Sequence, residues 1–405
     1  MPFRIALSGV NAAQTDLTVT ANNIANVGTT GFKESRAEFA DLFANTRQGV
    51  ARTATGNGVR VANISQQYSQ GNIDFTDSSL DLALSGSGFF AVSNGGARSY
   101  TRAGGFQVDN QGFIVNSDGA RLQGYAPLST GGFNTGGLGD ILVSTSESAP
   151  EPTTAAQVTL NLPSNATVPG SGTFDPADAT SYTNATSLTV FDSLGAAHTA
   201  TLYFLKDTAP NEWTTQLYVD GTAVGTQQPL VYSPTGTLTT PASGGITFPA
   251  YTPATGANPL NMTFDFSTTT QYGDTFGVNS ITQDGFTTGR LIGINIDQTG
   301  VVQARFTNGR SIPLGQVAIA NFANQQGLQQ LGDSQWSETF ASGQALLGQA
   351  GNSGFGTLQS GALESSNVDI TEQLVNMITA QRNFQANAQM IQTADAITQT
   401  IINIR

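Results

Sequence analysis

The amino-acid sequence predicts a mainly β protein with α-helical termini and nested, discontinuous antiparallel β domains. Two observations carry this prediction. Both ends of the 405-residue chain repeat apolar side chains at steps of three and four, which is typical of helices of coiled-coil type. Between them, 46 glycines and abundant Thr, Ser and Asn separate short alternating apolar runs, as expected for antiparallel strands and turns.

The last run of the chain, from about Leu363 to Arg405, contains no Gly or Pro and predicts a long helix. Its three- and four-residue apolar repeat consists of Ile370, Leu374, Met377, Phe384, Ala388, Ile391, Ala394 and Ile401. Gln381 and Thr398 occupy the two remaining positions of this stripe, so the apolar seam is incomplete. The remaining surface is mostly neutral amides and hydroxyls rather than Lys and Glu.

The first residues predict a second helix that ends near Ile24. Its repeat consists of Phe3, Ala6, Val10, Ala13, Leu17, Thr20 and Ile24, and the glycines of Asn26-Val27-Gly28-Thr29-Thr30-Gly31 then break the pattern. Two interpretations fit these end helices. They pack on the chain's own body, or their nearly uncharged outer faces meet something other than bulk water.

The alternating pattern divides the middle of the chain into two predicted β domains. Turn signals such as Asp109-Asn110-Gln111-Gly112 and Asp297-Gln298-Thr299-Gly300 mark the two halves of a discontinuous domain, 81–147 plus 287–342. Residues 148–286 predict a second domain inserted between these halves, with Lys206 as its only basic residue besides the neutral His198 against ten acidic residues. Residues 28–80 plus 343–363 are predicted to be a connector, and 1–27 plus 364–405 a helical inner domain.

Composition excludes several classes of function. Cysteine is absent, so disulfides and thiolate chemistry are excluded. A net charge of −13 argues against nucleic-acid binding, and no apolar run has the length of a membrane span. We therefore expect no nucleic-acid partner and no membrane insertion.

The sequence offers little catalytic equipment, and we predict no catalytic, metal or cofactor-binding residues. Gly86-Ser87-Gly88-Phe89-Phe90-Ala91 fits a nucleotide-binding pattern but leads into a strand instead of opening a helix. His198 is the only histidine, which excludes a multi-histidine metal site, and we interpret it as a turn or strand-edge residue. Asp333 and Ser334 are expected to form a turn. Arg98, Arg102 and Arg121 are interpreted as surface ion-pair partners.

Three sets of motifs resemble the bacterial flagellar rod and hook family of axial proteins. The first comprises Asn22, Asn23, Ile24, Asn26, Gly31, Phe32 and Lys33. The second begins at Leu80-Asp81-Leu82-Ala83-Leu84 and continues at Leu314-Gly315-Gln316-Val317-Ala318. The third joins Glu364-Ser365-Ser366-Asn367-Val368-Asp369 to Gln381-Arg382-Asn383-Phe384. Phe384 departs from the family, because many relatives carry Tyr there.

The resemblance implies a structural subunit of the flagellar hook, since the insertion is similar to the outer domain of the hook branch. It implies a helical homopolymer that acts as a curved universal joint around the export channel, located in the extracellular hook of the flagellum and exported without a cleaved signal peptide. The terminal helices would form the inner tube, ordering only on assembly, through Phe3, Val10, Leu17, Ile24, Ile370, Leu374, Met377, Phe384, Ile391 and Ile401. Implied partners are other copies of the chain, the rod, hook cap and hook-filament junction proteins, and the export apparatus.

Two alternatives remain open at this point. One is a distal rod subunit, which the long insertion disfavours. The other is a secreted β-rich carbohydrate-active enzyme, which would need two facing carboxylates in a cleft and would leave both terminal seams unexplained.

Overall fold

The computed structural model describes residues 2–42, 56–129, 131–144, 146–170 and 173–403, with side chains placed for residues 3–400 of these ranges. Its contacts divide the chain into two compact units. The first contains Met1–Ser144, Gly293–Ala304 and Ile312–Arg405, and the second contains Thr145–Ile292 and Arg305–Ser311. The predicted insertion, 148–286, falls inside the second unit, whereas the finer division of the chain remains a prediction. Neither helix of the described chain combines the length and apolar character needed to cross a bilayer.

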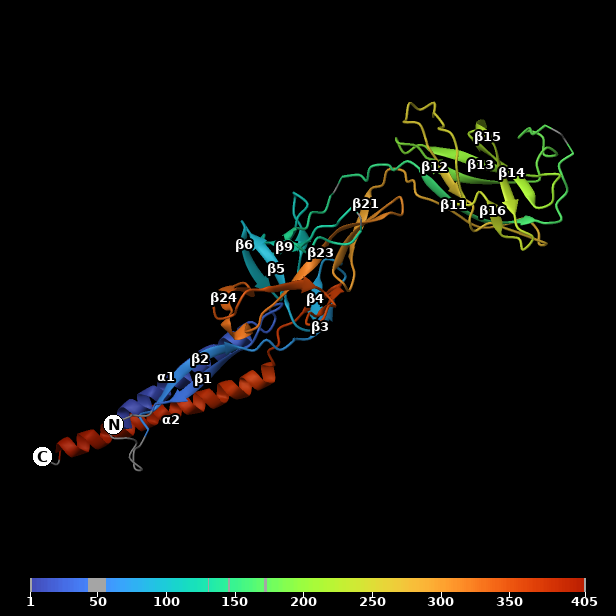
Figure 1. Ribbon diagram of the computed structural model, residues 1–405. Coiled ribbons are helices and arrows are strands. Elements are labelled where there is room, and N and C mark those ends of the chain that lie inside the picture. The colour runs from blue at the N-terminus through green and yellow to red at the C-terminus, as the bar shows by residue number, and fades with distance from the viewer. Residues whose placement is uncertain (1, 43–55, 130, 145, 171–172, 404–405) are drawn as a thin grey trace. The chain divides into compact units, whose positions relative to one another are not determined.

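In the first unit, helices α1 (Pro2–Ala25) and α2 (Ile370–Asn403) lie side by side and run antiparallel (Figure 1). The antiparallel register follows from two contacts. A Cβ atom added to Gly9 would lie 2.5 Å from the Asn387 side chain, and Asn23 Nδ2 donates to Gln373 Oε1 at 3.2 Å. A side chain at position 9 would therefore require the Asn387 side chain to move.

The buried side of α2 differs from the predicted seam. Gln373 and Ala380 are buried, at 2% and 0% exposure, whereas Ile370 and Leu374 are 48% and 47% exposed. Gln373 takes the interior position because its amide accepts from Asn23 and donates to Glu34, so a hydrogen-bonded polar pair replaces an apolar contact. Ile370 and Leu374 therefore lie outside the contact between α1 and α2 within one chain, and their predicted role in assembly stays a prediction.

Most of the other residues of the two predicted apolar repeats are half-buried. Along α2, Met377, Phe384 and Ile391 are half-buried, and the side chain of Ile401 lies outside the described residues. Along α1, Val10, Leu17 and Ile24 are half-buried, whereas Phe3 is 51% exposed. Whether any of these residues takes part in assembly remains a prediction.

The connector contains regular structure that its mixed sequence did not predict. Strands β1 (Ser35–Asp41) and β2 (Val59–Gln66) form an antiparallel pair beside α1 (Figure 1). Two shorter pairs join early and late segments of the chain: β3 (Ile73–Phe75) with β28 (Ala362–Glu364), and β4 (Leu82–Ser85) with β27 (Thr357–Ser360). The two connector segments are therefore held together by backbone hydrogen bonds.

The largest sheet pairs strands from both segments of the predicted discontinuous β domain. Its central order is β21-β22-β23-β9-β5-β6-β25-β24. The strands of this sheet are β5 (Phe89–Asn94), β6 (Ala97–Thr101), β7 (Gln107–Val108), β8 (Ile114–Val115), β9 (Arg121–Tyr125), β10 (Gly139–Asp140), β21 (Leu291–Ile296), β22 (Val301–Phe306), β23 (Ser311–Asn321), β24 (Gln329–Gly332), β25 (Gln335–Ser337) and β26 (Leu346–Gln349). A short 3-10 helix, Gln325–Gly327, precedes β24.

The tight turns share one hydrogen-bonded design. In Asp109 to Phe113, one side-chain oxygen of Asp109 accepts from the backbone N–H groups of Gln111 and Phe113, both at 2.8 Å. The glycine before Phe113 has a φ of +89°, which favours Gly. The same pattern recurs in the turns that begin at Asn116, Asp192 and Asp297.

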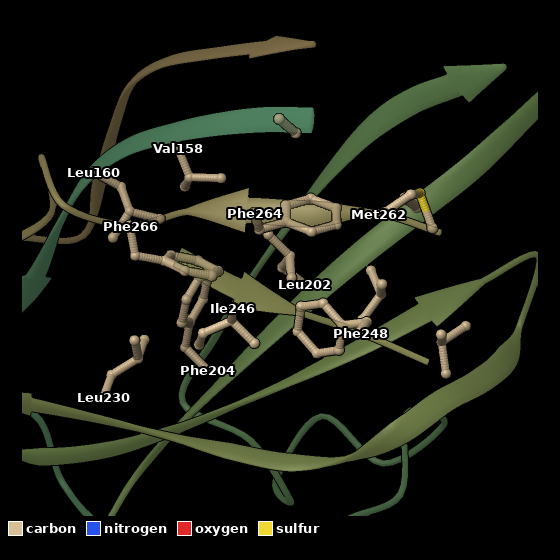
Figure 2. Packing of buried hydrophobic residues seen from close by; sticks show 14 of the residues in the cluster. Val158, Leu160, Leu202, Phe204, Leu230, Ile246, Phe248, Met262, Phe264 and Phe266 are labelled. Carbon is tan, nitrogen blue, oxygen red and sulfur yellow. The ribbon is translucent and has the colours of Figure 1, made fainter. Parts of the chain in front are cut away.

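In the second unit, two five-stranded sheets of described residues enclose an apolar core. The first sheet is an antiparallel meander of β12 (Asn184–Phe191), β13 (Ala197–Lys206), β14 (Glu212–Val219), β15 (Thr222–Tyr232) and β16 (Leu238–Thr240). The second consists of β11 (Ala155–Pro163), β17 (Gly245–Thr247), β18 (Thr263–Asp265), β19 (Thr270–Tyr272) and β20 (Gly277–Gln283). Figure 2 shows Phe266 beside Phe204 in this core, which the alternating apolar residues of both sheets fill.

Candidate functional site

The two ends of the chain meet at a buried group of charges made of Lys33, Arg102 and Glu364, which we call the buried triad. Lys33 Nζ lies 2.6 Å from Glu364 Oε1, and Arg102 Nη1 lies 3.1 Å from Glu364 Oε2. The three side chains are 0%, 4% and 0% exposed. One carboxylate from the start of the C-terminal segment therefore neutralises two cations from the N-terminal part of the chain.

Further hydrogen bonds hold the triad in place, although the buried Arg102 Nε has no hydrogen-bond partner among the described residues. Lys33 Nζ also donates to the Ser69 carbonyl at 2.7 Å, and Arg102 Nη2 donates to the Gly86 carbonyl at 2.7 Å. Glu364 Oε1 accepts from the Gly71 backbone N–H at 2.9 Å. Burial lowers the pKa of Lys33, and the negative charge of Glu364 opposes that shift. These bonds fix the carboxylate between segments that are far apart in sequence.

The motif residues at the end of α1 surround this triad. Asn23 pairs with the backbone of Ser35 in both directions, at 2.8 and 3.0 Å, which ties α1 to β1. The Gly31 N–H donates to the Glu364 carbonyl at 2.8 Å. Gly31 has a φ of +68°, and an added Cβ would lie 2.4 Å from the Ala103 backbone nitrogen, so only glycine fits there.

The remaining motif residues act more locally. Phe32 is buried beside Gly31 and Lys33, whereas Asn22 is exposed and Ile24 is half-buried. Asn26 Nδ2 donates to the Asn22 carbonyl at 2.9 Å and so closes the last turn of α1. The structure thus brings Asn23, Gly31, Phe32 and Lys33 together around the start of the C-terminal segment.

Arg102 and Glu364 correct the sequence-based interpretation. Arg102 was predicted to be a surface ion-pair partner, but it is buried and shares Glu364 with Lys33. Sequence reasoning had no signal for this pair, because the two residues are 262 positions apart. Arg121 does behave as predicted, since it forms a partly exposed ion pair with Asp140 at 2.9 Å.

His198 lies near the start of a strand rather than in a turn, which fits the second of the two predicted alternatives. It lies in β13 and is 7% exposed. Its Nδ1 lies 2.6 Å from Asp220 Oδ2, and its Nε2 lies 3.2 Å from Asp192 Oδ2. A neutral imidazole carries only one N–H, so two carboxylate partners require the protonated, charged form. Both ring nitrogens are thereby occupied, which leaves neither free to activate a serine.

The other catalytic candidates take structural positions. Asp333 and Ser334 form a turn with φ values of +49° and +54°, as predicted. The glycine-rich stretch at Gly86 leads directly into β5, and no helix begins there. Among the residues whose positions are described, no group of three His, Asp or Glu side chains is arranged to hold a metal ion.

Comparison with known protein families places the chain among flagellar axial proteins. Four family models match: the flagellar basal body rod protein at residues 3–33, the flagellar hook protein FlgE/F/G D1 domain at 83–190, the flagellar basal body protein FlaE D2 domain at 161–286, and the flagellar basal body rod FlgEFG protein C-terminal region at 359–404.

Relatives that match over their full length identify the branch of the flagellar axial proteins to which the chain is similar. The chain is 40% identical to the flagellar hook protein FlgE of Escherichia coli strain K12 over 100% of both chains, and 39% identical to that of Salmonella typhimurium, again over 100% of both. The FlgE of Borreliella burgdorferi is 32% identical over 98% of both chains. The chain therefore belongs to the flagellar hook protein family, a family of structural subunits, and the rod alternative is set aside.

A solved structure supports the fold independently. The crystal structure of the Helicobacter pylori flagellar hook protein FlgE2 aligns with a TM-score of 0.54, covering 72% of this chain and 100% of that chain. At 15% sequence identity, this similarity concerns the fold alone.

The triad predicts an asymmetric response to mutation. Glu364→Gln should lower the free energy of unfolding of the first unit by about 3–5 kcal/mol, because it leaves two buried cations without a counterion. Lys33→Met should cost less, since Arg102 still neutralises Glu364. Urea unfolding followed by Trp336 fluorescence in a Trp213→Phe background measures both. Glu338→Gln serves as a control for the loss of one negative charge, and equal losses for Glu364→Gln and Lys33→Met would contradict the shared-carboxylate assignment.

The His198 pair predicts a pH dependence of the second unit. Burial alone would lower the pKa of His198, but the bonds to Asp220 and Asp192 outweigh burial and raise it. Because the pKa of His198 is higher in the folded state than in the unfolded state, protonation of His198 stabilises the folded state. This stabilisation is complete at pH values below the unfolded pKa of about 6.5, and it is lost as the pH rises through the folded pKa. The pKa values of Asp192 and Asp220 are lowered despite burial, so their contribution is lost instead as the solution becomes acidic.

Urea unfolding of the second unit, followed by Trp213 fluorescence in a Trp336→Phe background, should therefore show falling stability as pH rises above the unfolded His198 pKa. His198→Gln should abolish this part of the dependence. Because the chain has one histidine, its NMR titration reports the folded pKa directly. A His198 pKa at or below the value in unfolded peptides would contradict this assignment.

Proposed function

We propose that the chain polymerises head to tail into a curved, flexible tube that acts as a universal joint between the flagellar motor and the filament. In this proposal the terminal helices form the inner wall of the tube around the export channel. Copies of the same chain are the main partners, and the rod, the hook cap, the hook-filament junction proteins and the export apparatus are the others. The chain is exported without a cleaved signal peptide, acts outside the cell and has no catalytic role.

One observation carries this proposal, an exposed apolar surface at the start of α2. It consists of Ile370, Leu374, Val375 and Ile378, which are 48%, 47%, 58% and 50% exposed, and we call it the open helix face. These residues lie within three turns of helix, and Leu374, Val375 and Ile378 are on the side away from the buried Gln373 and Ala380. Covering such a surface with another molecule removes apolar area from water. In a polymer of one subunit, a neighbouring copy of the chain supplies that cover.

The charge of the inserted domain supports weak contacts at the outside of the tube. Its only Lys or Arg residue, Lys206, is 9% exposed and donates to the backbone carbonyls of Asp207, Ala209 and Glu212 at 2.8 to 3.0 Å. Apart from the buried Asp192, the ten acidic residues of 148–286 thus face neighbouring copies with little positive charge to bind. Like charges disfavour tight packing, so we expect these domains to slide past one another as a curved tube rotates.

The open helix face gives a direct test of assembly. Leu374→Asp should prevent the purified chain from polymerising, because it would bury an unpaired carboxylate between copies. It should leave the folded monomer intact, since Leu374 is already 47% exposed. Electron microscopy and sedimentation measure polymer, and circular dichroism measures folding. Asn383→Asp, at another exposed position of α2, is the matched control, and normal tubes from folded Leu374→Asp would overturn the assignment of this face.

Deleting residues 148–286 tests the division of labour between inner and outer parts. The shortened chain should still form tubes, because the terminal helices and the large sheet are retained. Their curvature and stiffness should change, since the domains that slide at the outside are absent. Electron microscopy of the tubes, with the full chain polymerised in parallel, measures both properties. A folded deletion variant that forms no polymer at all would show that the inserted domain is needed for assembly itself.

A further inference from the structure

A cleft of about 580 Å³ lies between α1, β1 and α2 in the first unit. Three carboxylates line it, from Asp16, Glu34 and Glu372, together with the guanidinium of Arg36. Val19 and Phe39 add apolar surface, and Phe39 is 42% exposed. We call this the acidic cleft. Its lining combines apolar contacts with an excess of negative charge.

The negative charge of this cleft is poorly compensated within the chain. Across the described part of the chain, none of the three carboxylates forms a salt bridge. Burial raises the pKa of Asp16. For Glu34, burial and the neighbouring charge of Glu372 raise the pKa, against a hydrogen bond from Gln373 and the charge of Arg36. A cation brought into the cleft from outside would therefore be stabilised.

Arg382 is an unpaired cation on the same unit. It is exposed, and no carboxylate of the described residues lies within salt-bridge distance. It follows Ile378 by four residues, so it extends the open helix face by one turn. It also lies two residues beyond the fully buried Ala380, about 200° around the helix, and so points away from the side of α2 that packs on α1. Within the described chain, Arg382 forms no salt bridge with any of the three carboxylates of the acidic cleft.

We infer that Arg382 of one copy enters the acidic cleft of the next copy, while Leu374 and Ile378 pack beside Val19 and Phe39 of that cleft. This inference rests on the proposed function and names the two surfaces that join. Charge complementarity supports it, because one side of α2 carries apolar side chains and a lone arginine, and the other side faces carboxylates and an exposed phenylalanine. Two different surfaces that fit each other make a heterologous contact, which yields an open polymer when the rotation does not close a ring.

Charge reversal tests the pairing. Arg382→Glu should raise the concentration of full-length chain needed for polymerisation by about tenfold or more, the effect of placing like charges at an interface. Adding Glu372→Arg to this variant should restore most of the loss. Adding Asp395→Arg instead, which reverses the other acidic residue of the described helix, should not. Gln385→Glu controls for a new negative charge on the exposed side of α2.

The absence of native cysteine permits a second test by cross-linking. A chain carrying both Arg382→Cys and Glu372→Cys, treated as polymer with a short thiol-reactive cross-linker, should give a ladder of multimers. The two positions are ten residues apart, about 15 Å along the helix, so a short linker cannot join them within one chain. Each single variant should give no ladder.

The outcomes separate this inference from the proposed function. A wild-type chain that forms no tubes under any condition counts against the proposed function. If wild-type tubes form, polymerisation of Arg382→Glu at the wild-type concentration overturns the inference alone. Rescue by Asp395→Arg instead of Glu372→Arg, or no ladder from polymer of the double-cysteine variant, would also overturn it.

Discussion

The first unit depends on a single carboxylate. Glu364 neutralises Lys33 and Arg102, accepts the Gly71 N–H through its side chain, and accepts the Gly31 N–H through its backbone. In a buried setting, a charge is tolerated only when it is paired and hydrogen-bonded. Each of the two cations therefore requires the C-terminal segment to be in place, and the C-terminal segment is positioned by them.

This arrangement explains why motif residues at opposite ends of the chain occur together. Gly31 allows the chain to turn against Ala103, Asn23 ties the helix to β1, and Lys33 reaches Glu364. Helix α2 begins six residues after Glu364, so the direction of the longest helix is set close to the triad. In the proposed tube, this joint would resist separation under load, because its parts cannot come apart without exposing buried charge.

Much of the fold could be predicted from local patterns. The end of α1 was predictable because Asn26 to Gly31 breaks an apolar repeat, and the split β domain was predictable from alternation on both sides of the insertion. The hairpin of β1 and β2 was not, because Ala37 is the only fully buried residue of β1 and its partner strand lies beyond residue 56. The structure of β1 is set by its pairing with β2 and its packing on α1, not by an alternating apolar pattern in its own sequence.

Side-chain networks were the least predictable part. The local sequence around Arg102 gives no sign that this residue is buried. Its burial depends on Glu364, which is distant in the sequence. Gln373 is buried in α2, where the apolar repeat predicts Leu374 instead. It is buried because its side chain hydrogen-bonds to Asn23 and Glu34. His198 had a detectable signal, since Asp192 and Asp220 flank the hairpin of β13 and β14, but their convergence on one ring requires the strand register.

The self-bonded turns that begin at Asp109, Asn116, Asp192 and Asp297 bear on the order in which the molecule is built. Each closes a loop of a few residues with its own oxygen atoms and needs nothing from distant segments. Such hairpins form in microseconds, whereas pairing β5 and β9 with β23 requires closing a loop of about 200 residues around an inserted unit. We therefore expect the local hairpins to form first and the long-range pairing of the largest sheet to form last.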